Sequence, residues 1–254
     1  MTAIRRIYIG LPAYNEEIAL PRLLTRIELL IASSQLPITV VLYNDGSTDA
    51  TAPVAREWQQ RLPVVVRDCA ENKGLGAGLR ALVEYAVTTA DEKDVLVIMD
   101  CDDTHDPVQI IEMLNAMDDG IADVVIGSRF VRGATVRGVP LLRQITSWGA
   151  AALFKLILPV HGVWDYTCGY RSYRVSALKK AAAHYGARLN EEAGFACMVE
   201  LLLKLNAISI PMTEVPLKLR YDLKPTESKM GVGSNIRRLL VLLVRWRLWG
   251  FGAR

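Results

Sequence analysis

The chain is poor in cysteine and lacks the spacings that metal-binding and disulfide-linked cysteines usually have. Four cysteines occur among 254 residues, and no two of them form a CxxC pair. Neither a structural zinc site nor a disulfide framework is therefore expected. We expect reduced thiols, as in cytoplasmic proteins.

Long apolar segments are also missing, although 51% of the residues are hydrophobic. No run of 18 apolar residues occurs, so we expect no transmembrane helix. The first six residues lead directly into a strand pattern, so a signal peptide is not expected either. The length and the 22% of charged residues indicate one large folded domain, or a domain with an appendage.

Acidic residues are absent from the end of the chain. After Glu227 there are six basic residues and no Asp or Glu, while the whole chain has a formal net charge of +3. A net negative body with a basic tail predicts an anionic partner for the tail. We expect this partner to be a membrane surface and not a nucleic acid.

In the first half of the chain, short apolar segments alternate with helical patterns. The apolar segments lie at residues 7–11, 38–43, 64–66, 95–99 and 124–126, and the polar loops after them at 12–16, 44–49, 72–78, 100–106 and 127–129. This alternation predicts an α/β fold whose mostly parallel sheet carries helices on both faces. Because parallel strands end at one edge, the five loops are expected to share one site.

The second half is less regular. We expect a helix at 141–158, a turn into a strand at 165–174, helices near 176–185 and 193–205, edge strands within 208–221, and a last helix at 236–249. The last helix combines an apolar run with flanking arginines and two tryptophans, Trp246 and Trp249. It is predicted either to lie at a membrane interface or to pack on its own domain or on a partner subunit.

Carboxylates crowd the end of the apolar segment 95–99. Asp106 followed by Pro107 suits the start of a helix, which leaves Asp100, Asp102 and Asp103 to be explained. If the chain stays extended, Asp100 and Asp102 point to the same side and need a cation between them. Mg²⁺ or Mn²⁺ fits such hard oxygen ligands and usually bridges a substrate phosphate. The alternative is an acidic turn solvated at the surface.

Glycines 74, 76 and 78 open a predicted helix after a strand, so a dinucleotide-binding oxidoreductase has to be weighed. The fit is poor, because Leu79 stands where the fingerprint G-x-G-x-x-G needs its last glycine. The fingerprint also belongs to the first strand–helix turn of a fold, whereas this is the third. A tight turn explains the glycines as well.

Four short motifs together resemble those of family 2 glycosyltransferases with the GT-A fold. They are Pro12-Ala13-Tyr14-Asn15-Glu16, Asn44 to Asp49, Asn72-Lys73-Gly74 and Asp100-Cys101-Asp102. The resemblance implies that the first motif, Asp45, Lys73, Gly74 and Asp100 bind the nucleotide of a nucleotide sugar. It also implies that Asp100 and Asp102 hold Mg²⁺ or Mn²⁺, which clamps the leaving diphosphate.

The second half resembles dolichyl-phosphate mannosyltransferases and related polyprenyl-phosphate glycosyltransferases. The resemblance rests on Gly127-Ser128-Arg129, Arg143 with Ser147, Asp165 to Arg171, Glu214-Val215-Pro216 and Ser228-Lys229. It implies that Arg129, Arg143, Ser147, Arg171, Ser228 and Lys229 bind the acceptor, and that Arg129, Arg143 and Lys229 join the two aspartates in catalysis. A lipid phosphate is already anionic, so it needs cations to position it and no general base.

Three departures from the family pattern affect the expected site. Asn44 replaces a first aspartate and alters the expected base and ribose contacts. Thr104 replaces a glutamine of the metal shell, so Asp103, Thr104 or water has to complete it. The C-terminal transmembrane helices of longer family members have no counterpart in this sequence.

The predicted protein is a GT-A glycosyltransferase domain at 1–234 followed by a basic apolar helix at 235–254. We expect inverting transfer of a hexose to a polyprenyl or dolichyl phosphate, with GDP-mannose as the first candidate donor and UDP-glucose as the second. The expected location is peripheral, on the cytoplasmic face of the membrane, with a membrane protein or a second copy as a further partner. Transfer to a hydroxyl, with Glu191 or Glu192 as base, and nucleotide-sugar binding without transfer are the alternatives.

Overall fold

The fold was analysed in a computed structural model that describes residues 5–224 and 232–249. Its centre is a seven-stranded sheet in the order β3-β2-β1-β4-β7-β5-β8. The strands are β1 Ile7–Ala13, β2 Ile38–Asp45, β3 Val64–Cys69, β4 Val95–Ile98, β5 Val124–Ser128, β7 Arg171–Arg174 and β8 Met212–Pro216. A separate pair is formed by β6 Thr135–Arg137 and β9 Lys218–Arg220. The predicted α/β fold with a mostly parallel sheet is confirmed.

The central strands are built from residues that suit burial on both faces. All four residues of β4, Val95 to Ile98, are fully buried, and so is most of β1. Such continuous apolar runs are typical of parallel strands that are covered by helices on both sides. β4 lies beside β1, and here the strand order reverses. Ligands of open α/β sheets bind at such a reversal.

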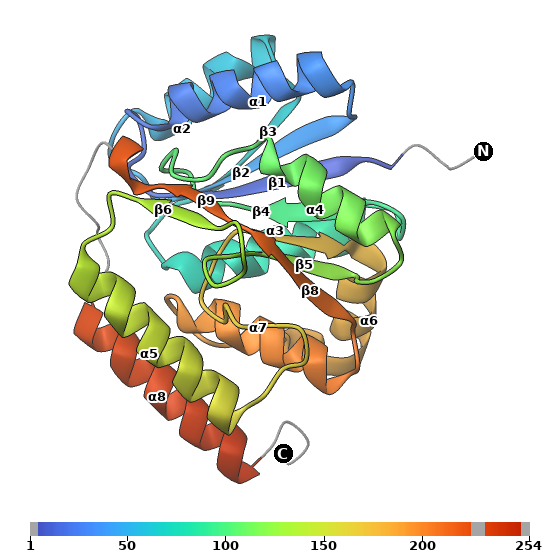
Figure 1. The fold of residues 1–254 in the computed structure, drawn as a ribbon. Helices are drawn as coiled ribbons and strands as arrows, with labels where there is room; N and C mark the ends of the chain where they lie inside the picture. Colours follow the sequence, from blue (N-terminus) through green and yellow to red (C-terminus); the bar gives the residue numbers. More distant parts are fainter. Residues whose placement is uncertain (1–4, 225–231, 250–254) are drawn as a thin grey trace.

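Helices cover both faces of the sheet and continue past its edge (Figure 1). They are α1 Leu20–Ser34, α2 Thr51–Glu57, α3 Leu75–Thr89, α4 Gln109–Asp118, α5 Leu141–Ile157, α6 Val175–Tyr185, α7 Ala196–Ala207 and α8 Val232–Trp249, with short 3-10 turns at Trp58–Gln60, Gly186–Arg188 and Tyr221–Leu223. α3 packs on β1 and β2 and contacts α6 and α7, while α4 packs on β5, β7 and β8. α5 and α8 lie side by side at one end of the molecule, and α8 also contacts α7.

Strand β1 is longer than the sequence indicates. We expected Pro12 to end it, but Pro12 pairs with Tyr43 of β2 and the strand continues to Ala13. Proline is tolerated here because β1 pairs with β4 only as far as Gly10, so the missing N–H of Pro12 interrupts no ladder on that side. The extension carries the chain two residues further toward the edge where the loops gather.

Strand β7 is the one antiparallel member of the described sheet, and it lies between β4 and β5. Because it runs the other way, its amino end, and not its carboxyl end, meets the loops after β4 and β5. The segment that leads into it, residues 165–170, therefore enters the sheet from the edge where those loops lie. The sequence predicted a turn into a strand here, but neither its direction nor its position.

Candidate active site

The acidic loop after β4 folds back on itself. The backbone N–H of Asp100 donates to Nδ1 of His105 at 3.1 Å, and the His105 ring stacks on Tyr170 with ring centroids 4.8 Å apart. Thr104 Oγ1 donates to Oδ1 of Asp102 at 2.6 Å. Asp100, Asp102, Thr104 and His105 all line one pocket. His105 therefore supports the acidic loop.

The remaining two carboxylates of the loop face a different partner. Asp103 has a left-handed backbone conformation, with φ of 62°, and its carboxylate accepts from Nη1 of Arg26 at 2.7 Å. Nη2 of Arg26 is 3.0 Å from Asp106. Neither Asp103 nor Asp106 lines the pocket. Of the three candidates for the third metal ligand, Asp103 is thus excluded by its position, while Thr104 and water remain.

Asp102 has a charged partner that the sequence did not indicate. Nζ of Lys224, just after β9, lies 2.6 Å from Oδ2 of Asp102. Burial alone would raise the pKa of Asp102, but Lys224 and Thr104 outweigh it and lower that pKa. For Asp100 burial prevails and raises the pKa; His105 opposes this shift, and the charge of Asp102 adds to it. The pKa values of the two aspartates are thus shifted in opposite directions, as those of neighbouring carboxylates in different surroundings are.

The two aspartates fit a divalent cation only as part of a mixed shell. Within residues 5–224 and 232–249, no cluster of three or more His, Cys, Asp or Glu side chains could hold a metal. Mg²⁺ commonly uses one or two carboxylates and takes its other ligands from water and substrate phosphate. Gly169 leaves room beside Asp100, because it has no Cβ. A Cβ at this position would lie 3.3 Å from Oδ1 of Asp100. Asp100 and Asp102 would therefore hold the ion, with at least part of the shell supplied from outside.

Arg129, at the end of β5, lines the opposite side of the same pocket, and a buried carboxylate holds it in place. Its Nε and Nη2 donate to Asp165 at 2.8 and 2.7 Å, and Nη2 also donates to Thr167 at 2.7 Å. Asp165 is fully buried; burial would raise its pKa, but the contact with Arg129 lowers it. No described residue uses Nη1 of Arg129, so this donor remains for a ligand.

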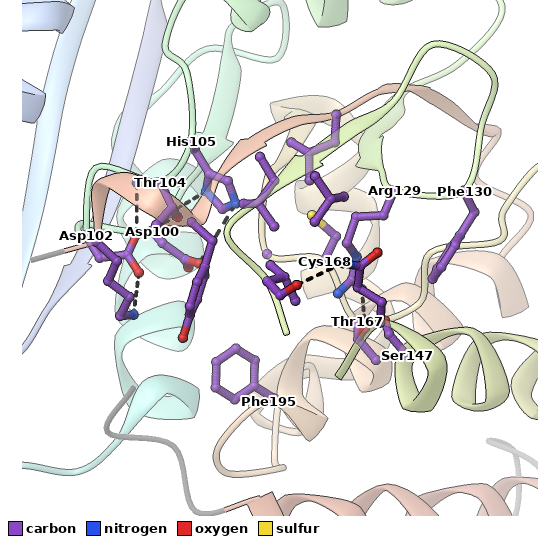
Figure 2. Close-up of a pocket in the computed structure, with 18 of the residues that line it drawn as sticks. Asp100, Asp102, Thr104, His105, Arg129, Phe130, Ser147, Thr167, Cys168 and Phe195 are labelled. Carbon is purple, nitrogen blue, oxygen red and sulfur yellow. Dashed lines mark hydrogen bonds and ion pairs between the residues drawn. The ribbon is translucent and has the colours of Figure 1, made fainter. Parts of the chain in front are cut away.

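The pocket between these two ends is largely apolar. Figure 2 shows the acidic loop on one side, Arg129 with Thr167 and Ser147 on the other, and Phe195 between them. Its apolar lining consists of Phe130, Val136, Val139, Trp148, Phe195, Leu217 and Leu219. Trp148 belongs to α5 and is 53% exposed, so the pocket extends to the surface of that helix. An anion with an apolar tail would find both kinds of lining here.

Some predicted acceptor residues are in the pocket and others are not. Ser147 lines it, as expected. Arg171 does not: its side chain is fully buried and donates to the carbonyl oxygens of Cys168, Met198 and Tyr166 at 2.8, 2.7 and 2.6 Å. The prediction that Arg171 binds the acceptor is therefore wrong, because the side chain is fully buried and each of its three guanidinium nitrogens donates to a backbone carbonyl. The side chain of Arg143, with Ser228 and Lys229, lies outside the described residues.

The predicted nucleotide residues lie at or beyond the carboxyl ends of β1, β2, β3 and β4, which are consecutive neighbours in the sheet. Asp45 accepts from the backbone N–H groups of Lys73 and Gly74 at 2.9 and 2.7 Å, which ties the glycine loop to β2. Asn15 Oδ1 accepts from the N–H of Thr48 at 2.8 Å and ties the loop after β1 to the loop after β2. Pro12, Ala13, Tyr14 and Glu16 belong to the same stretch. Nucleotide binding by these residues stays a prediction.

Asn44 has a structural reason to be an amide. Its Nδ2 donates to Asp68 at the end of β3, at 2.9 Å, and its Oδ1 accepts from the N–H of Ser47 at 3.1 Å. An aspartate at position 44 would place two carboxylates against each other. The neighbouring carboxylate of Asp68 thus explains why position 44 carries an amide and not the aspartate of the family pattern.

Gly76, the second residue of α3, serves close packing. A Cβ on Gly76 would lie 2.3 Å from the carbonyl oxygen of Glu192, so only glycine lets the loop before α7 approach α3. The carboxylates of Glu191 and Glu192 pair with Lys204 at 3.5 Å and with Arg245 at 2.8 Å. Neither glutamate lines the pocket, which removes the support for a general base at these positions.

The sequence missed Lys224, Thr167 and Phe195 as pocket residues. Thr167 lies within the stretch 165–171 that carried the resemblance, so the motif already pointed to it. Lys224 and Phe195 have no such signal. They reach the pocket through the path of the chain after β9 and before α7, which local patterns do not describe.

Comparisons with known proteins agree with this geometry. A family model described as glycosyl transferase family 2 matches residues 8–181. Polyprenol monophosphomannose synthase of Mycolicibacterium smegmatis is 33% identical over 252 residues, covering 97% of this chain and 88% of that protein. Undecaprenyl-phosphate mannosyltransferase of Micrococcus luteus is 31% identical over 244 residues, covering 96% and 94%.

A solved structure shows the same fold. Glucosyl-3-phosphoglycerate synthase of Mycobacterium tuberculosis, in complex with Mn²⁺, uridine diphosphate and phosphoglyceric acid, superposes with a TM-score of 0.67. It is 17% identical, and the match covers 98% of this chain and 80% of that one. At this identity the likeness establishes the GT-A type fold alone.

Proposed function

The chain belongs to glycosyl transferase family 2 and is a glycosyltransferase, and from this premise we propose that it transfers mannose from a nucleotide sugar to a polyprenyl phosphate. The observation that carries the proposal is the pocket that joins two aspartates at one end to Arg129, held by the buried Asp165, at the other. GDP-mannose is the first candidate donor and UDP-glucose the second. The sheet order supports the assignment, because the donor and acceptor residues follow strands on either side of its reversal.

The reaction forms one bond and breaks one bond at the anomeric carbon. A phosphate oxygen of the acceptor attacks this carbon from the face opposite the nucleotide, and the nucleoside diphosphate leaves with the electrons of its bond to the sugar. Attack from this face inverts the anomeric configuration. The acceptor oxygen already carries negative charge, so no proton has to be removed. This agrees with a pocket in which no histidine or glutamate is placed as a base among the described residues, since His105 is engaged with Asp100.

The residues of the chain divide this work between the two ends of the pocket. Asp100 and Asp102 would hold Mg²⁺ or Mn²⁺, which supplies charge compensation for the leaving diphosphate when it is bound. At the other end, Nη1 of Arg129 faces the acceptor phosphate, and Asp165 fixes the guanidinium so that it binds without being reorganised. Ser147 offers a hydroxyl on the same side. Arg143 and Lys229 are proposed to add charge there.

We further propose that α5 and α8 place the enzyme on a membrane surface. Within the described residues, no helix has the length and apolar character needed to cross a bilayer. α8 packs on its own domain through Leu242 and Leu243, as one of the alternatives predicted. Large apolar side chains of both helices nevertheless remain exposed, namely Leu141, Ile145, Trp148, Leu153 and Leu156 on α5 and Leu240, Val241, Val244 and Leu248 on α8. Arg237, Arg238 and Arg247 are exposed on the same α8.

This apolar face suits the substrate. The two helices lie side by side (Figure 1). Trp148 of α5 is exposed and also lines the pocket. A polyprenyl chain held in a bilayer could therefore present its phosphate to Arg129 without leaving the membrane. Tryptophan and arginine are also the side chains that favour the interfacial layer. The cytoplasmic face stays a prediction.

The proposed function is tested by incubating the protein with radiolabelled GDP-mannose or UDP-glucose and a short-chain polyprenyl phosphate. We expect an organic-soluble labelled product from GDP-mannose that mild acid releases, because glycosyl phosphates hydrolyse more easily than glycosides. An acid-stable product would instead indicate transfer to a hydroxyl. Binding of the donor without any product would indicate a nucleotide-sugar-binding protein.

A further inference from the structure

Lys224 occupies an unusual position for a cation in a site built for a metal. It lines the pocket just after the turn Tyr221–Leu223, its side chain is only 16% exposed, and its Nζ bonds Asp102 at 2.6 Å. Both oxygens of Asp102 are then in use, because Oδ1 accepts from Thr104. A divalent ion that binds Asp102 through Oδ2 would have to occupy the place of the ammonium group.

The ammonium group and a divalent ion cannot share this oxygen closely. Two cations that touch the same carboxylate oxygen repel each other strongly where burial limits screening by solvent, and both Lys224 and Asp102 are largely buried. The attraction between Lys224 and Asp102 is therefore lost when the ion binds. Lysine suits such an exchange, because its four-carbon side chain is flexible and its charge is compact.

The displaced ammonium group would find a new anion close by. A nucleotide sugar brings a diphosphate to the pocket, and its departure leaves additional negative charge on the diphosphate oxygens. We propose that Lys224 is an exchangeable counter-ion, which bonds Asp102 in the free enzyme and moves to the donor diphosphate when Asp102 binds the metal. The destination rests on the proposed function, whereas the competition at Asp102 rests on the structure alone.

The exchange predicts opposite effects on two kinds of binding. Without Lys224, Mn²⁺ alone should bind more tightly, because nothing has to leave Asp102. GDP in the presence of saturating Mn²⁺ should bind more weakly, because one cation beside the diphosphate is missing. A residue that only stabilises the loop would weaken both, so the crossed pattern distinguishes the two roles.

The test compares wild type with Lys224→Met, which keeps an unbranched side chain, one atom shorter, and removes its charge. Free Mn²⁺ is followed by electron paramagnetic resonance, and GDP binding by calorimetry at saturating Mn²⁺. We expect the Kd for Mn²⁺ alone to fall about tenfold or more, and the Kd for GDP to rise about tenfold or more, as for loss of a charge-assisted bond. Lys224→Arg retains the charge and should behave like wild type in the first measurement.

Arg26→Met is the matched control, because it removes a cation from the same acidic loop but from Asp103 and Asp106. A similar gain in Mn²⁺ affinity for Arg26→Met would show that net charge alone is responsible and would overturn the proposal. An unchanged or weaker Mn²⁺ affinity of Lys224→Met would overturn it too. None of these measurements requires transfer activity, so failure of the exchange and failure of the proposed mannosyl transfer are observed separately.

Discussion

At the scale of single residues, the two aspartates of the pocket are the sharpest test of the metal assignment. Asp100→Asn and Asp102→Asn each replace a charged ligand by a weak neutral one. We expect each to lower the transfer rate about 100-fold or more, since the lost charge compensation is worth several kcal/mol in comparable sites. The measurement is the initial rate over a Mg²⁺ or Mn²⁺ titration, with urea unfolding to verify the fold. Full activity of both variants in EDTA would end the metal assignment.

Asp165 controls both the position of Arg129 and the stability at acid pH. Asp165→Asn leaves the half-buried guanidinium without its counter-charge and should lower the free energy of unfolding by about 3–5 kcal/mol. Its pKa in the folded protein is lowered, because Arg129 outweighs burial. The stability that Asp165 contributes is therefore present above the unfolded value of about 3.9 and is lost as the pH falls through the folded value.

We accordingly expect the urea midpoint of the wild type to fall more steeply below about pH 4 than that of Asp165→Asn. Urea titrations from pH 5 to pH 3 measure the difference. Parallel pH dependences of the two proteins would show that the pair does not shift the titration of Asp165.

At the scale of the elements, the contact between α3 and the loop before α7 depends on one missing Cβ. Gly76→Ala would bring that atom to 2.3 Å from the carbonyl oxygen of Glu192, and backbone would have to move. We expect a loss of about 1–3 kcal/mol in unfolding free energy, as for overpacked cores. Gly149→Ala in α5 is the matched control, because its added Cβ would meet nothing within 4 Å. That change should be neutral or slightly stabilising. Equal losses in both variants would contradict this account.

The elements themselves were largely predictable, because apolar periodicity determines them. The segment 95–99 and the helix at 141–158 were found almost with their observed bounds, as β4 and α5. β7 was not placed, since Arg171-Ser-Tyr-Arg174 shows no apolar alternation and its neighbours lie far away in the chain. Arg171 was misassigned for a related reason. Arginine is rarely fully buried, and only the three carbonyl acceptors around it make burial possible.

Most motif residues of the candidate site were predictable because they lie at or just after the carboxyl end of a strand; Ser147, on α5, is an exception. The side chains that pair with these residues were not predictable from the sequence. The buried Asp165 beneath Arg129 belonged to a quoted motif, but the pairing of the two is a matter of tertiary distance. Lys224 came from a loop that showed only polar composition. The spacing of motifs along the chain therefore located the site, whereas its ion pairs could be identified only from the structure.

At the scale of the whole molecule, we propose that the exposed apolar side chains of α5 and α8 bring the enzyme to its lipid substrate. Replacing Leu240, Val244 and Leu248 by Gln should abolish most of the binding to anionic vesicles, because each leucine buried in the interface adds about 1.5–3 kcal/mol. Leu29→Gln on α1, at 63% exposure, is the matched control and should bind normally. Co-sedimentation at low and high salt measures both, and salt should weaken only the contribution of the arginines.

In this experiment, transfer to a long-chain acceptor should fall together with vesicle binding, while a short-chain acceptor should be used as before. An intact protein that stays in the supernatant at both salt concentrations would contradict the proposed binding of this face to membranes. The soluble-acceptor alternative would then gain support.

The antiparallel strand β7 also determines how far apart the reacting groups stand. It separates β4, which ends in the acidic loop, from β5, which ends at Arg129. Neighbouring strands lie about 4.8 Å apart, so the insertion holds the two loops roughly 10 Å from each other. Direct pairing of β4 with β5 would halve this gap. The reversed strand therefore sets the spacing between the acidic loop and Arg129 at the two ends of the pocket.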